Sequence, residues 1–130
     1  MGLRWGAVDL RHGRLKVRVS RTLGEDNPPK TVKSAREITL LPEVVAVLRA
    51  AKPLHAAVNT FVFPTQAGTP LDEERFVEKH WHRGLRGTDV RPRKFYATRH
   101  TFISVALTKG ANLKWLADYC GTSVEMIEKH

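Results

Sequence analysis

The sequence predicts a mainly α-helical α+β domain with a small three-stranded antiparallel sheet near its N-terminus. Segments that alternate apolar and polar residues with period two occur only within residues 8–40, which is typical of strands. After Pro42 the apolar residues recur at helical spacing between capping residues and glycines. With 130 residues, 42% of them hydrophobic, the chain is long enough to bury a core, and we expect one domain over residues 1–130.

The predicted sheet begins with a hairpin over Leu10–Ser20. Arg11–Arg14 contains the glycine of its turn, and Leu15–Ser20 alternates as a strand. Thr22–Pro29 holds Gly, Asp, Asn and two prolines, which indicates a loop. Ala35–Leu40 alternates again and is the third expected strand.

Helices are expected over residues 42–51, 72–86, 94–109, 113–120 and from 124 onward. Pro42 suits a first helical turn, because that position needs no backbone N–H. Gly110 and Gly121 are suited to end helices. Asn112 and Ser123 are suited to cap the two last helices, because their side chains can accept from exposed backbone N–H groups.

The charge of the chain points to a polyanionic partner. Its 22 basic and 13 acidic residues give a net charge of +9, and basic residues dominate Arg11–Arg21 and Arg83–Arg99. Such a balance favours nucleic acid. No apolar run is long enough for a membrane span, and the N-terminus lacks a secretory signal pattern. The single cysteine, Cys120, excludes an internal disulfide and suits a reducing cytoplasm, where we expect the protein to act.

One motif carries the most information. Residues 96–104 read Tyr-Ala-Thr-Arg-His-Thr-Phe-Ile-Ser after the basic run Arg91–Lys94, and Cys-Gly-Thr-Ser follows at 120–123. This order resembles the end of the catalytic domain of phage-type tyrosine recombinases, or integrases. The resemblance implies site-specific recombination or integration of mobile DNA through a phosphotyrosine intermediate. It also implies a double-stranded DNA partner, a tetramer on DNA, and no metal or nucleotide cofactor.

The resemblance assigns roles to particular residues. Arg99 matches the second active-site arginine, and a planar, permanently charged fork is suited to phosphoryl oxygens that gain charge in the transition state. Lys30 lies in a Lys-Thr … Ser-x-Arg pattern that matches the family's general-acid hairpin, with Lys33 as the alternative. His100 matches a histidine that mostly orients the site, and its direct contact with phosphate stays open.

Two positions depart from the family pattern. Tyr96 stands where the family usually has His, and Thr122 stands where it has His or Trp. A tyrosine hydroxyl can donate a hydrogen bond to phosphate but does not shuttle protons near neutral pH, and a threonine can donate one weaker bond. The alternative for both is structural: Tyr96 packs on its helix, and Thr122 caps the helix that follows.

The resemblance also concerns the two ends of the sequence. Leu3-Arg4-Trp5 with Val8-Asp9-Leu10 resembles the segment after the family's first catalytic arginine, so that arginine is expected before Met1, with Arg4 as the alternative. The family's nucleophilic tyrosine follows the turn by nine residues, which from Thr122 gives position 131. We therefore expect a partial catalytic domain that lacks its first segment and its nucleophile segment and does not cleave DNA alone.

Two other functions remain open at this point. The first is a non-catalytic DNA-binding remnant or regulator of the same fold, which the altered positions Tyr96 and Thr122 favour. The second is an unrelated helix-turn-helix regulator built on Asn112–His130. Glu125 and Glu128 on its last helix would face the DNA backbone unfavourably.

Overall fold

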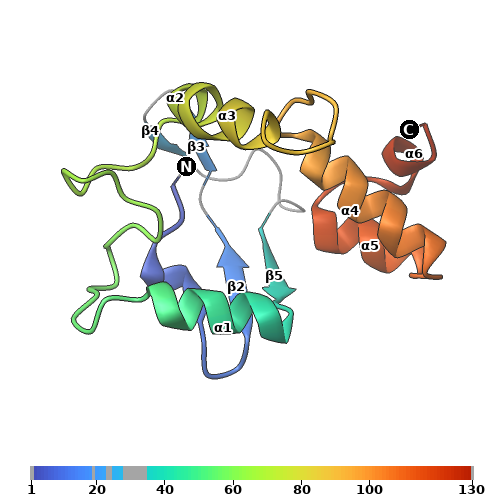
Figure 1. Ribbon diagram of the computed structural model, residues 1–130. Helices are drawn as coiled ribbons and strands as arrows, with labels where there is room; N and C mark the ends of the chain where they lie inside the picture. The colour runs from blue at the N-terminus through green and yellow to red at the C-terminus, as the bar shows by residue number, and fades with distance from the viewer. Residues whose placement is uncertain (1, 19, 23–24, 28–34, 130) are drawn as a thin grey trace. The chain divides into compact units, whose positions relative to one another are not determined.

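The computed structural model describes residues 2–18, 20–22, 25–27 and 35–129. By their contacts the residues divide into two compact units, Met1–Leu71 and Asp72–His130. Figure 1 shows the strands and α1 in the first unit and the remaining helices in the second. No helix in the described part of the chain is long and apolar enough to cross a membrane.

The first unit contains the predicted three-stranded antiparallel sheet. A short 3-10 turn, η1 (Trp5–Ala7), leads into β1 (Val8–Asp9), and the other strands are β2 (Arg14–Val17) and β5 (Arg36–Thr39). The strand order is β1-β2-β5, so β2 is the central strand. Leu15 pairs with Ile38 in the ladder, as period-two alternation over both segments requires.

A second sheet is a correction to the sequence prediction. β3 (Ser20–Thr22) and β4 (Glu25–Asn27) pair antiparallel, with Ser20 opposite Asn27, where the sequence predicted a loop over Thr22–Pro29. The pairing joins main-chain groups, which every residue type provides. The weak strand preference of Glu, Asp and Asn is readily overridden when backbone partners are available.

The core of the first unit lies between the sheet and α1 (Pro42–Ala51). Pro42 occupies the first helical turn as predicted. Leu48 of α1 packs with Trp5, Val8 and Val62, and all four side chains are buried. Figure 1 shows α1 running across β2 and β5, which is the face that this core requires.

The second unit begins with one helical segment over the predicted range 72–86. It comprises α2 (Glu73–Phe76), a π-helical turn η3 (Val77–Trp81) and α3 (His82–Leu85). The Asp72 carboxylate caps it, accepting from the Arg75 backbone N–H at 2.9 Å. The π turn holds more residues per turn than an α-helix, so it shifts the apolar stripe that a regular α-helix would carry.

Three further helices complete the second unit: α4 (Ala97–Thr108), α5 (Leu113–Cys120) and α6 (Val124–Glu128). Asn112 caps α5 by accepting from the Trp115 N–H at 3.0 Å, and Ser123 caps α6 by accepting from the Met126 N–H at 3.3 Å. Gly110 and Gly121 adopt φ of 80° and 66°, the left-handed conformation in which glycine ends a helix. These predicted caps and stops are confirmed.

The core of the second unit joins these helices. Leu116 is completely buried, and Ala117, Cys120 and Ile127 surround it. Ile103 and Ala106 of α4 pack against this cluster. Cys120 is therefore a small buried apolar residue, as the sequence predicted, rather than an exposed thiol.

Candidate functional site

Arg99 lies in the first turn of α4. Its guanidinium carbon is 5.9 Å from the centre of the Tyr96 ring, a cation–π contact. Among the described residues, the guanidinium makes no hydrogen bond and no ion pair. The side chain is half-buried. Because no described residue accepts from its N–H groups, these donors remain available to an anion.

Tyr96, at the start of α4, and His100 lie on the same side of the helix, because residues four positions apart are neighbours on successive turns. Their rings meet edge to face, with centroids 5.4 Å apart at 72°. Tyr96 is 60% exposed. It thus packs on the helix, as the structural alternative supposed, and its exposure also leaves room for its hydroxyl to meet a ligand. The structure brings Tyr96, Arg99 and His100 into one group.

The backbone amides at the start of α4 are already engaged. The N–H groups of Ala97, Thr98 and Arg99 donate to the carbonyls of Lys94, Phe95 and Tyr96, at 2.9, 3.1 and 3.1 Å. These tight turns explain why α4 begins at Ala97 and not at the predicted Lys94. Because these amides have partners, positive charge at this helix start comes from side chains.

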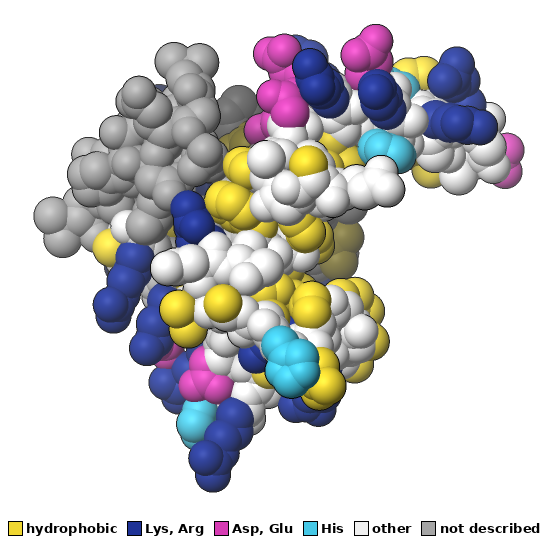
Figure 2. Space-filling model, turned by 90° about the vertical axis from the view of Figure 1, so that its left-hand side faces the viewer, with side chains coloured by type: hydrophobic (Ala, Val, Ile, Leu, Met, Phe, Trp, Pro, Cys, Tyr) yellow, Lys and Arg dark blue, Asp and Glu magenta, His cyan; other side chains and the backbone are white. Residues whose placement is uncertain are grey.

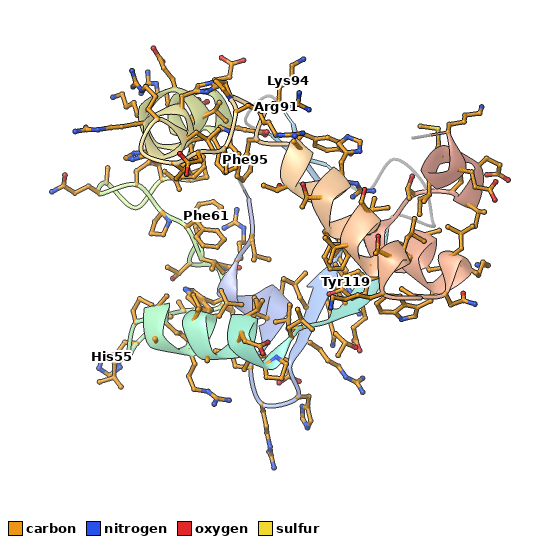
Figure 3. All side chains as sticks on the ribbon, turned by 45° about the vertical axis from the view of Figure 1, so that its right-hand side comes forward. His55, Phe61, Arg91, Lys94, Phe95 and Tyr119 are labelled. Carbon is orange, nitrogen blue, oxygen red and sulfur yellow. The ribbon has the colours of Figure 1, made fainter. Side chains whose placement is uncertain are left out.

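The basic run Arg91–Lys94 is anchored to the helix before it. Trp81 Nε1 donates to the Arg93 carbonyl at 2.7 Å. The Phe95 ring lies edge to face against both Trp81 and Phe76, with centroids 5.2 and 5.5 Å apart. Figure 3 labels Arg91, Lys94 and Phe95 along this connection into α4. This role of Trp81 was not predicted from the sequence, although aromatic residues flank the basic run there.

Thr122 lies in the turn between α5 and α6. Its backbone N–H donates to the Ala117 carbonyl at 3.0 Å, directly after the left-handed Gly121. The cap of α6 is Ser123, so Thr122 does not have the capping role considered as its structural alternative. Within the described residues no hydrogen bond or ring contact joins Thr122 to Arg99 or Tyr96.

The predicted general acid cannot be placed beside Arg99. Lys30 and the alternative Lys33 both lie outside the described residues. Arg4, the alternative for the first catalytic arginine, has structural contacts in the first unit: its Nη1 donates to the Asn59 carbonyl at 2.8 Å, and its guanidinium carbon lies 4.3 Å from the Phe61 ring centre. These contacts give the Arg4 side chain a structural role within the first unit.

Tyr119 is the second tyrosine of the sequence, and its setting makes it a poor nucleophile. Its ring stacks on Phe102 at 5.7 Å and lies 4.9 Å from Trp115. Burial among these groups raises the pKa of the Tyr119 hydroxyl, with a smaller contribution from Cys120. A raised pKa reduces the fraction of the reactive phenolate.

Comparison with known proteins gives matches to integrases. The chain is 29% identical over 143 residues to the prophage integrase IntR of Escherichia coli K12, covering 92% of this chain and 35% of IntR. No family model matches the chain.

The fold matches solved structures of the Tn1549 transposon integrase. One complex with a circular intermediate DNA gives a TM-score of 0.77 at 22% identity, covering 98% of this chain and 47% of that one. A second complex, with transposon right end DNA, gives a TM-score of 0.75 at 23% identity with the same coverage.

Fold and motif point to the same class of proteins. The described helices and sheet have the arrangement of solved integrases, and an unrelated helix-turn-helix protein would not share it over nearly the whole chain. The resemblance in sequence extends to a prophage integrase. The chain thus has the fold of solved integrases and is similar in sequence to a prophage integrase, and it spans about a third of the length of that curated relative.

Proposed function

We propose that the protein that contains this chain is a site-specific tyrosine recombinase that cleaves and rejoins double-stranded DNA. The observation that carries the proposal is the state of Arg99. It lies at the start of α4 in the motif that resembles the family's, and no described residue pairs with its charge. The net charge of +9 supports a polyanionic substrate.

The proposed reaction needs little from the protein except positioned charge and two proton transfers. A tyrosine hydroxyl gives its proton to solvent water as its oxygen attacks a backbone phosphorus, the bond from phosphorus to the 5′ oxygen breaks, and that oxygen takes a proton from Lys30. Arg99 binds the phosphoryl oxygens as their negative charge grows. The phosphotyrosine ester conserves the bond energy, so a 5′ hydroxyl can reverse the step without a nucleotide.

The other residues of the site have supporting roles in this proposal. Tyr96 donates a hydrogen bond to the phosphate, and its ring contacts the Arg99 guanidinium. His100 orients Tyr96 through the edge-to-face contact of their rings. Thr122 donates one weaker bond where the family has His or Trp. The nucleophilic tyrosine is expected nine residues after Thr122, as the resemblance implies.

The relatives support DNA as the substrate. The transposon integrase whose fold matches was solved in complex with circular intermediate DNA and with transposon right end DNA. A tetramer on paired DNA sites, in the cytoplasm and without metal or nucleotide, is the form that we propose for the whole protein.

The test uses the full-length protein and nicked, labelled attachment-site DNA. A covalent adduct is expected on a denaturing gel, and Arg99→Ala is expected to lower its rate of formation by about a hundredfold or more. Lys30→Ala is expected to be similarly impaired. Lys114→Ala is the matched control, because the Lys114 ammonium already forms an ion pair with Asp118 of the same helix, α5, at 2.8 Å.

A second candidate function is a DNA-binding protein of the same fold without chemistry. The observation that favours it is the replacement of two expected imidazole or indole groups by Tyr96 and Thr122. Salt-sensitive DNA binding with no adduct in the assay above would select this candidate over the recombinase.

A further inference from the structure

We propose that the loop Arg91–Lys94 and the start of α4 form a second phosphate site, which holds a DNA backbone phosphate other than the one at Arg99. The inference rests on the proposed DNA substrate and deepens it. A cavity of about 410 Å³ opens here, lined by side chains that include Arg91, Arg93, Lys94, Tyr96 and His100.

The charge of the cavity selects an anion. Three permanent cations line it, and none of the described lining residues is a carboxylate. Among the described residues, the side chains of Arg91, Arg93 and Lys94 form no ion pair. A phosphate there would meet arginine forks and an ammonium group, which bind phosphate oxygens through charge-assisted hydrogen bonds.

The loop is held in place before any ligand arrives. The bond from Trp81 Nε1 to the Arg93 carbonyl fixes the middle of the loop, and Phe95 between Phe76 and Trp81 fixes its end. Exposed cations on a free loop would lose conformational entropy on binding, and this anchoring reduces that cost. Figure 3 shows the labelled Arg91 and Lys94 in the loop beyond the anchored Phe95.

The site is next to Arg99 but separate from it. Arg99 is not among the residues that line the cavity, whereas Tyr96 lines it and also contacts the Arg99 guanidinium at 5.9 Å. Tyr96 therefore stands between the two groups of cations. This arrangement suits two phosphates of DNA. The phosphate at Arg99 is the one that reacts, and the phosphate in the loop cavity positions the protein on the duplex.

The test measures how binding of the full-length protein to a labelled non-specific DNA duplex depends on NaCl, by fluorescence anisotropy. The slope of log K against log salt falls by about 0.9 for each phosphate contact that is lost. Arg91→Ala/Lys94→Ala is expected to reduce the slope by about that amount. Arg93→Ala is a second variant that removes the side chain and keeps the carbonyl that Trp81 holds.

Two further variants sharpen the test. Lys109→Ala/Lys114→Ala removes the same number of cations from the end of α4 and from α5, and its slope is expected to equal that of the wild type. Trp81→Phe keeps a ring against Phe95 and removes the donor to Arg93. It is expected to weaken binding about two- to tenfold, the net value of one hydrogen bond.

The outcomes separate this inference from the proposed function. Equal slopes for the loop variants and the Lys109/Lys114 control would overturn the phosphate site even if the adduct forms. A slope reduced only in the loop variants supports the site even if no adduct forms. Absence of DNA binding by the wild type would overturn the site, because its ligand would then be wrong.

Discussion

Arg99 has one neighbouring ring in cation–π contact. Tyr96, three residues earlier in the chain, lies under the guanidinium at 5.9 Å and meets His100 edge to face. Residues at this spacing share one side of a helix turn, so the group follows from the motif itself. The identity of residue 96 then decides whether the site has a hydroxyl donor in addition to the ring.

Tyr96→Phe separates these two roles. The variant keeps a ring for Arg99 and His100 and removes the hydroxyl, so the fold is expected to be unchanged. If the hydroxyl donates to the phosphate, adduct formation by the full-length protein slows by about tenfold or more, since such a bond to a charged group contributes about 1.5–3 kcal/mol. A rate equal to that of the wild type would leave Tyr96 with packing alone. The thermal midpoint of unfolding serves as the control for folding.

At the scale of elements, the hairpin turn after β1 is closed by one carboxylate. Asp9 Oδ1 accepts from the backbone N–H groups of Arg11 and His12 at 3.0 and 3.1 Å, and Oδ2 lies 2.7 Å from His12 Nδ1. The hydrogen bond from the His12 side chain is the main cause that lowers the pKa of Asp9 below its ordinary value of 3.8, and the His12 backbone adds to it.

This lowered pKa predicts a pH dependence of stability. A carboxyl whose pKa is lower in the folded state stabilises the fold above its unfolded pKa, and the stabilisation is lost as pH falls through the folded pKa. Asp9→Asn is therefore expected to lower the thermal midpoint at neutral pH, by a small amount because the carboxylate is exposed. The difference from wild type should shrink as pH falls below 3.8 and disappear below the lower pKa that Asp9 has in the folded state. Asp89→Asn, at an exposed position in a loop, is the control.

At the scale of the whole molecule, charge is the dominant property. The chain has 22 basic and 13 acidic residues, and Figure 2 shows clusters of Lys and Arg side chains, with some Asp and Glu among them, beside hydrophobic and uncharged surface. Ion pairs such as Arg14–Glu37, at 2.8 Å, neutralise part of the charge. A surface of this kind attracts a polyanion before any specific contact forms.

The charge predicts strong salt dependence of DNA binding. Affinity for a non-specific duplex is expected to fall by about a hundredfold or more between ~50 and ~200 mM salt, since each phosphate contact releases counterions. Anisotropy titrations with the full-length protein measure this directly. Affinity that does not change with salt would contradict a binding mode based on backbone phosphates.

Much of the local structure was predicted from the sequence. The strand segments of the three-stranded sheet, the caps Asn112 and Ser123 and the stop at Gly121 all follow from residues within a few positions of one another. The same holds for the group of Tyr96, Arg99 and His100, which one helix assembles. The comparisons bear out the recombinase resemblance that the motif around Arg99 indicated.

Contacts between distant residues were decided only by the folded chain. The pairing of β3 with β4, the π turn of η3 and the bond from Trp81 to the Arg93 carbonyl have no signature in the local pattern. Thr122 has the expected motif position, but among the described residues no hydrogen bond or ring contact joins it to Arg99, and the roles of Lys30 and Thr122 stay predictions. Local backbone geometry is set by neighbouring residues, whereas such a partner is chosen by which surfaces pack together, and packing exists only once the whole unit has folded.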